Sequence, residues 1–149
     1  MFIVNVEGAI HRNGKWLFIK RSEKEEHAAG AISMVGGKCD MEGMSSDILE
    51  RTLMREIYEE VGIKVSNLTY VNSSAFVTDK GTHVIDIVFL CEYITREPYA
   101  KSEEEVAAVM WMSTQEVLEN PHSPNYLKEN IKRAELVLQG KERRAAVIE

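Results

Sequence analysis

The spacing of apolar and polar residues changes along the chain, and each type of spacing predicts a different kind of element. Residues 4–10 have a β-type apolar pattern, Asn13-Gly14 is a strong signal for a tight turn, and residues 16–19 resume the apolar pattern. We therefore predict an N-terminal β-hairpin. After a charged segment, residues 31–35 form a short apolar run that we expect to end at Gly36-Gly37, where a loop begins.

The residues that follow this loop show the clearest helix signal. Asp47 and Glu50 have the D-x-x-E spacing of a capping box, and neither proline nor glycine occurs between them and Gly62. Gly62 stands where a C-terminal cap is expected. The sequence thus predicts a helix that ends at Val61, with the side chain of Asp47 as its N-terminal cap.

The second half of the chain is predicted to contain both strands and helices. Residues 65–77 and 84–93 have strand patterns, and the second run is apolar almost without interruption, which is typical of a strand covered on both faces. We expect a sheet with helices on both sides. Further predicted elements are a strand at 106–112, a short helix capped by Ser113 and Glu116, a helix from Ser123-Pro124 to Gly140, and a loose tail after it.

Composition and charge narrow the classes of function that the chain can have. With 149 residues, 44% of them hydrophobic, it is long enough for one domain, which we place at residues 1–140 with a tail at 141–149. The net charge of -6 argues against a nucleic-acid polymer or an anionic membrane as partner, and no apolar run approaches the roughly 20 residues of a membrane span. The lack of such a run and of an N-terminal signal pattern predicts a cytoplasmic protein, and two distant cysteines, Cys39 and Cys91, predict reduced thiols.

Three carboxylates share one face of the predicted central helix. Glu56, Glu59 and Glu60 fall on the same arc of an α-helix, and like charges at this spacing repel one another. The neighbouring apolar stripe, which can seat the helix on a sheet, consists of Leu53, Ile57 and Val61. Because Arg55 can balance only part of this charge, and because hard cations take carboxylate oxygens, the arc predicts a Mg²⁺ or Mn²⁺ site. The alternative is an ordinary solvated helix face.

The residues around these acids carry a resemblance to a known family. Arg55 directly precedes Glu56, Gly62 ends the helix after the acids, and a glycine pair lies upstream. In this arrangement the chain resembles the Nudix hydrolases, whose motif reads G-x5-E-x7-R-E-U-x-E-E-x-G-U, where U is a bulky aliphatic residue. Residues 55–63 match its second half in full. The resemblance implies an α/β fold, the Nudix-type α/β/α sandwich with a mixed β-sheet between helices.

The first half of the motif departs from the family pattern. Counting back from Arg55 places the motif glutamate at Asp47 and the motif glycine at Met41, whereas the glycine pair stands at residues 36–37. The intervening loop is therefore longer than usual. Asp47 is interpreted as a helix cap, and two alternatives stay open: Asp47 also stands in for the missing glutamate, or Glu42 takes that place from the loop.

The resemblance also implies a reaction. The family members are metal-dependent hydrolases that cleave the pyrophosphate linkage of a nucleoside diphosphate derivative, here a nucleotide sugar such as ADP-ribose or a (deoxy)nucleoside triphosphate. Mg²⁺ or a related ion neutralises the phosphate oxygens and acidifies a water. The implied metal ligands are Glu59, Glu60, the carbonyl of Gly36, and Glu56, which alternatively orients the water as a base. Arg55 would hold Glu56 in place.

Residues outside the motif complete the implied site. The family often takes one more carboxylate from a loop before a strand that carries a tryptophan. Of the acids at 103–105, which lie ahead of Trp111, we select Glu104. Arg21 and Lys38 are candidate phosphate contacts by position, and solvated surface cations are the alternative for both.

Two functions from different classes therefore compete. The first is the hydrolase, with a small-molecule nucleotide as its partner, and a homodimer is compatible with the sequence. The second is a catalytically weak nucleotide-binding or regulatory Nudix module, which Asp47 and the long loop favour and the intact acidic arc disfavours. The base and the leaving group depend on loops such as 27–32 and 78–83, for which the sequence provides no code.

Overall fold

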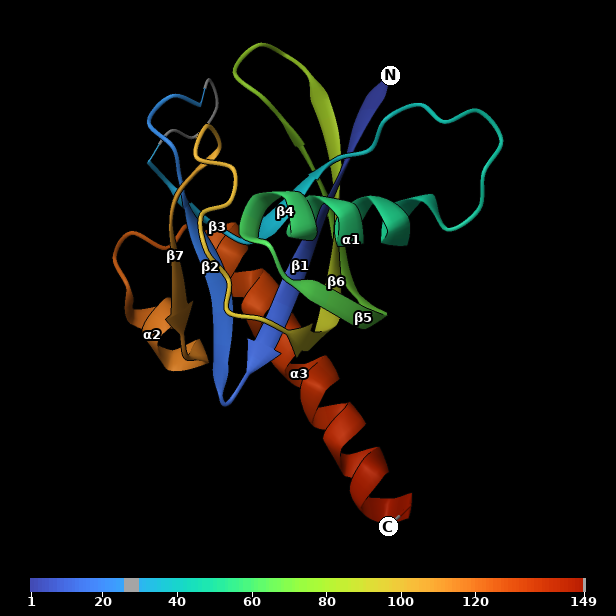
Figure 1. Ribbon diagram of the computed structural model, residues 1–149, viewed down its shortest axis with the longest axis vertical. Helices are drawn as coiled ribbons and strands as arrows, with labels where there is room; N and C mark the ends of the chain where they lie inside the picture. The colour runs from blue at the N-terminus through green and yellow to red at the C-terminus, as the bar shows by residue number, and fades with distance from the viewer. Residues whose placement is uncertain (26–29, 149) are drawn as a thin grey trace.

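A computed structural model describes residues 1–25 and 30–148 of the protein. Within this part of the chain, a mixed seven-stranded sheet lies between two helical layers, with α1 on one face and α2 and α3 on the other (Figure 1). The α/β/α sandwich predicted from the sequence is confirmed. The elements are β1 (Phe2–Arg12), β2 (Lys15–Arg21), β3 (Ile32–Ser33), β4 (Val35–Lys38), α1 (Ile48–Val61), β5 (Lys64–Val77), β6 (His83–Thr95), β7 (Val106–Met112), α2 (Thr114–Glu119) and α3 (Asn125–Ile148).

Strand β1 has partners along both of its edges and so organises the sheet. It runs parallel to β6 from Phe2 to His11, and it forms the predicted tight hairpin with β2. Nearer its start, the edge that faces β2 pairs with β4 instead, at Asn5–Gly8. The strand order is β3-β2-β1-β6-β5, with β7 paired to β2. β4 therefore lies beside the first half of β1 and brings the glycine pair against it.

Each face of the sheet has its own hydrophobic core. The residues of α1 in the first core are Leu53, Ile57 and Val61, all fully buried. This confirms the predicted apolar stripe. The residues of α2 and α3 in the second core include Val117, Leu127 and Ile131. Because side chains alternate along a strand, Val6 and Ile10 of β1 join the first core and Ala9 joins the second.

Two of the three caps predicted for α1 and α2 are confirmed. Gly62 has φ 72° and donates its N–H to the carbonyl of Tyr58, as expected for a C-terminal cap. Ser113 and Glu116 form the predicted capping box at the start of α2. The predicted cap by Asp47 is wrong. Asp47 has a left-handed backbone, with φ 54° and ψ 33°, and its side chain makes no capping hydrogen bond, because a capping side chain requires an extended backbone.

The glycine pair does not end a strand, as we had expected, but lies inside one. β4 passes through both glycines to Lys38, and it pairs Gly36 with Glu7 of β1. A Cβ atom on Gly36 would collide with the backbone carbonyl of Val6. The second glycine meets α1 in the same way, as described below. The two glycines are therefore needed because neighbouring segments pack closely against them, and not because the chain turns there.

The C-terminal helix is longer than predicted. α3 continues through Gly140 to Ile148, so the loose tail expected after residue 140 is wrong. Val137 and Leu138 pack partly buried against the second core, and Lys141 donates a hydrogen bond from Nζ to Oγ1 of Thr69 at 2.8 Å. These contacts continue on both sides of Gly140, and they outweigh the cost of one glycine within a helix, which is about 1 kcal/mol.

Two further expectations concern the thiols and the membrane. Cys39 is partly buried and Cys91 is buried, and both are free, as predicted. Among the described residues, none of the helices has the length and hydropathy that crossing a membrane requires.

Gly140→Ala should stabilise the protein. Alanine is favoured over glycine within a helix by about 0.5–1 kcal/mol, and a Cβ at this position has open space around it. We expect the free energy of unfolding, measured by urea denaturation, to rise by that amount. Gly81→Ala is the control, because Gly81 has φ 83° and alanine there should destabilise. No change in Gly140→Ala would mean that α3 does not continue through residue 140.

Candidate metal and phosphate site

The three acids of α1 differ in their exposure to solvent. Glu59 is exposed, Glu56 is partly buried, and Glu60 is only 7% exposed. Burial is the main reason that the pKa of Glu60 is raised to about 8, and the charges of Glu105 and Glu56 raise it further. Burial and the charge of Glu59 raise the pKa of Glu56 in the same way. The arc predicted from the sequence is therefore not a fully solvated helix face.

Gly37 fixes the place of Glu56. A Cβ atom on Gly37 would collide with the carboxyl group of Glu56, and it would lie 2.7 Å from the Cγ of that residue. The Glu56 carboxyl group thus occupies the space in which a side chain at residue 37 would lie. Gly36, whose carbonyl was a predicted metal ligand, is the preceding residue of the same strand. The glycine pair places the β4 backbone directly beside the acidic face of α1.

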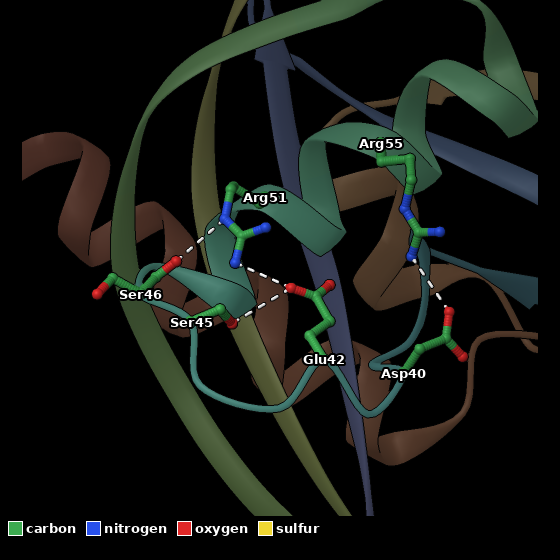
Figure 2. Close-up of polar contacts among 6 residues, drawn as sticks. All are labelled: Asp40, Glu42, Ser45, Ser46, Arg51 and Arg55. Atoms are coloured by element: carbon green, nitrogen blue, oxygen red, sulfur yellow. Dashed lines mark hydrogen bonds and ion pairs between the residues drawn. The ribbon is translucent and has the colours of Figure 1, made fainter.

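The loop between β4 and α1 is held to the helix by two arginines, which Figure 2 shows reaching from α1 to the loop. Arg51 contacts Glu42 at 2.9 Å and donates a hydrogen bond from Nε to the carbonyl of Ser46 at 3.0 Å. Arg55 lies 3.8 Å from Asp40. It also lies 3.6 Å from Glu56.

These contacts bear on the missing motif glutamate. Glu42 is engaged by Arg51, one turn before Arg55, and the side chain of Asp47 makes no capping contact. The loop acid that the structure brings to Arg55 is Asp40, and its charge also contributes to the raised pKa of Glu56. Sequence reasoning missed Asp40. The signal that could have found it is its closeness to the glycine pair, which fixes where the loop starts.

The segment between β6 and β7 closes the end of α1. The backbone N–H groups of Lys101 and Ser102 donate to the carbonyl of Glu60 at 3.0 and 3.4 Å, and that of Tyr99 donates to the carbonyl of Val61 at 3.1 Å. These bonds satisfy carbonyls that a helix end would otherwise leave unpaired. They also bring the acids at 103–105 to the end of α1.

Among the acids at 103–105, Glu105, and not the selected Glu104, is the one whose charge acts on the acids of α1. The carbonyl of Glu105 accepts a hydrogen bond from the N–H of Ser22 at 2.9 Å, and its charge raises the pKa of both Glu60 and Glu56. Glu104 lies 3.9 Å from Lys24, with its side chain 83% exposed. Three adjacent glutamates give no sequence signal that distinguishes them, so only the fold of this segment decides.

The two predicted phosphate contacts differ in their relation to the acids. Arg21, at the end of β2, lies 3.4 Å from Glu25, and its charge lowers the pKa of Glu60. Lys38 is exposed at the end of β4. The charge of Arg21 therefore acts on the buried acid of α1. Of the loop 27–32, residues 27–29 lie outside the described part of the chain.

The donor set fits a hard divalent cation. The charge of Glu105 raises the pKa of Glu60 and of Glu56, and a cation bound among these oxygens would relieve this repulsion. In the described ranges, no three acidic, histidine or cysteine side chains are already grouped as a complete metal site. The residues thus supply the oxygen ligands and the negative potential that Mg²⁺ or Mn²⁺ would need.

Comparison with known proteins identifies the family. Residues 2–132 match the NUDIX domain. The chain belongs to the Nudix family. A MutT Nudix hydrolase from Burkholderia pseudomallei has a similar structure, with a TM-score of 0.75 and 27% identity over 89% of this chain and 98% of that one. No curated protein sequence matches the chain.

More distant structures share the Nudix fold. The MutT protein from Methanosarcina mazei Go1 has a TM-score of 0.75 and 24% identity, covering 90% of this chain and 93% of that one. The NUDIX domain of NrtR from Shewanella oneidensis, solved as a complex with ADP ribose, has a TM-score of 0.64 and 16% identity, covering 96% and 88%. These neighbours confirm the fold expected from the motif.

Gly37→Ala should disturb the site more than the fold. The new Cβ would meet the flexible end of Glu56, which can move aside, whereas the Cβ of Gly36→Ala would meet the backbone of β1. We expect Gly36→Ala to lower the free energy of unfolding by about 1–3 kcal/mol or more, and Gly37→Ala to lower it less while weakening Mg²⁺ binding. Thermal unfolding and calorimetric metal titration measure both effects. Equal losses of stability in the two variants would contradict this assignment of the glycines.

Glu60→Gln should remove a pH dependence of stability. The pKa of an unfolded glutamate is about 4.3, and that of Glu60 in the folded protein is raised to about 8. Between these two pH values, the Glu60 carboxyl group is protonated in the folded protein and ionised in the unfolded one. The contribution of Glu60 to stability is therefore present at low pH and is lost as the pH rises through about 8. Denaturation of metal-free protein across this range should show a decline that is smaller in Glu60→Gln. Identical slopes in the two proteins would show that Glu60 is not buried as described.

Proposed function

We propose that this Nudix protein is a metal-dependent hydrolase that cleaves the pyrophosphate linkage of a nucleoside diphosphate derivative. The observation that carries the proposal is the burial of Glu60 beside Glu56 and Glu105. Burying one carboxylate beside two others costs free energy unless a cation compensates for the charge. Glu56, Glu59 and Glu60 would hold such a cation, which would supply positive charge to the phosphate groups of the substrate.

The proposed roles follow from exposure and contacts. Glu59, Glu60 and Glu56 hold Mg²⁺ or Mn²⁺, with the carbonyl of Gly36 as a further ligand, and Glu105 replaces Glu104 as the additional carboxylate. Once bound, the ion would neutralise phosphate oxygens and acidify a water. Glu56 is also the candidate base, because its pKa is raised and its position is fixed by Gly37.

Arg55 and Asp40 position the base in this proposal. Arg55 lies 3.6 Å from one oxygen of Glu56, and Asp40 lies 3.8 Å from the same arginine nitrogen, Nη2. Asp40 thus draws the guanidinium towards the loop and limits how strongly it pairs with Glu56. Asp40, and not Asp47 or Glu42, is then the acid that pairs with the motif arginine, Arg55.

The substrate is a small-molecule nucleotide. Arg21 is the proposed phosphate contact, because it is the cation whose charge reaches Glu60. Lys38 is a second candidate at the edge of the site. The ADP ribose in the NrtR structure makes nucleotide sugars one class to test, and the MutT neighbours make nucleoside triphosphates the other. The alternative, a catalytically weak nucleotide-binding or regulatory module, loses its support from Asp47, since Asp40 occupies the place beside Arg55.

The proposed function is tested by incubation with Mg²⁺ and a panel of dinucleotides, nucleotide sugars and triphosphates, with products identified by mass. We expect turnover to require the metal, and Glu60→Gln to lose about 100-fold or more in rate, beyond the effect of residues that only orient ligands. The melting temperature of metal-free Glu60→Gln should be equal or higher. Glu119→Gln, which removes an exposed charge on α2, is the control. Full turnover in excess chelator, or nucleotide binding without any hydrolysis, would refute the proposal.

A further inference from the structure

Residues 99–102, which we call the strap, are fastened to the end of α1. They belong to the segment that joins β6 to β7 and pass the last turn of the helix (Figure 1). Three backbone N–H groups of the strap donate to the carbonyls of Glu60 and Val61. Any residue except proline could form these bonds, so what is particular to this chain lies in the side chains of the strap.

Two side chains of the strap pack on the outer surface of the last helical turn. The ammonium nitrogen Nζ of Lys101 lies 3.7 Å from the centre of the Tyr58 ring, which is a cation–π contact. The ring of Tyr99 occupies the space in which a Cβ atom on Gly62 would lie. Lys101 is exposed and Tyr58 is 39% exposed, so their contact lies outside the hydrophobic core. Its effect is therefore on where the strap lies.

Ser102 joins the strap to the additional carboxylate of the proposed site. Its N–H donates to the carbonyl of Glu60 at 3.4 Å, and its own carbonyl accepts from the N–H of Glu105 at 3.0 Å. One residue thus links the backbones of these two acids. The carbonyl of Glu105 also accepts from Ser22, which follows β2 and not α1. A shift of the strap on α1 therefore changes the position of Glu105 relative to Glu60.

The position of the strap and the charge of Lys101 have opposite effects on metal affinity. A divalent cation shared by Glu60 and Glu105 needs both carboxylates within ligand distance, so a strap that is free to move would weaken binding. A lysine close to a cation site also repels the cation, so on charge alone the removal of Lys101 would tighten binding. The direction of the change therefore distinguishes the two effects.

We propose that Lys101 is a positioning residue for the metal site: its contact with Tyr58 holds the strap on α1 and so keeps Glu105 within reach of a divalent cation bound by Glu60. The inference rests on the proposed function for the cation and for Glu105 as its additional ligand, and it adds the contact that keeps this ligand in place. Lys101 touches neither the cation nor the substrate and acts through the backbone of the strap.

Calorimetric titration of the whole chain with Mg²⁺, and separately with Mn²⁺, tests this inference without substrate. Lys101→Met keeps an unbranched side chain and removes its charge. We expect it to bind the metal about 2–5-fold more weakly, the change to which an exposed cation–π contact corresponds. Lys101→Arg keeps a cation over the ring and should bind as the wild type does. Tyr58→Leu should weaken binding as Lys101→Met does, whereas Tyr58→Phe, which keeps the ring, should not.

A double-mutant cycle with Glu105→Gln shows whether Lys101 acts through this acid. Glu105→Gln removes a ligand charge and should weaken metal binding by itself. In that background Lys101→Met should cause no further loss, because the strap then positions no carboxylate. A general loosening of the fold would instead weaken binding in both backgrounds. Thermal unfolding of the metal-free variants confirms that each of them is folded.

Three results would overturn the inference: unchanged or tighter metal binding by Lys101→Met, an equal loss in Lys101→Arg, or a loss that persists in the Glu105→Gln background. Each of them leaves the proposed hydrolysis standing. Metal binding that responds to Lys101 as expected, in a protein that hydrolyses no nucleotide, would contradict the proposed function alone. A wild type that binds neither Mg²⁺ nor Mn²⁺ would contradict both.

Discussion

The close approach of β4 to both β1 and α1 is the constraint on which the site depends. Gly36 lies against the backbone of β1, and Gly37 lies against the carboxyl group of Glu56. Without side chains at these two positions, one short strand can pack between a strand and a helix. The acids of α1 are then held next to a backbone that presents carbonyl groups. The apolar stripe of the helix, from Leu53 to Val61, supplies the packing free energy that keeps this arrangement in place against the repulsion among its carboxylates.

The fold and the acidic arc could be predicted from the sequence because they depend on local patterns. Helix periodicity places Glu56 and Glu60 on one face, and Gly62 ends α1 as its sequence position indicates. The errors arose where tertiary contacts outweigh local signals. Asp47 has the sequence spacing of a helix cap, but the loop before it is held by the contact between Arg51 and Glu42. The backbone of Asp47 therefore has a left-handed conformation, in which its side chain does not cap the helix. α3 passes Gly140 because packing continues on both sides of it.

The missed site residues have a common reason. Asp40 and Glu105 are placed by loop anchoring, which links residues far apart in the chain. Glu105 is placed by a backbone hydrogen bond from Ser22, and Asp40 is placed by its contact with Arg55. No spacing in the sequence encodes such links.

The two arginine contacts of the loop between β4 and α1 have a consequence for how this motif can vary. Asp40 and Glu42 are tied to Arg55 and Arg51, one helical turn apart, so the start of the loop is fixed along the side of α1. The residues between Glu42 and the helix then contribute little to where Glu56 stands. Insertions there lengthen only the exposed tip around Gly43 and Met44. A family motif defined by fixed spacing can therefore be interrupted at this point in a member whose acidic residues keep their places.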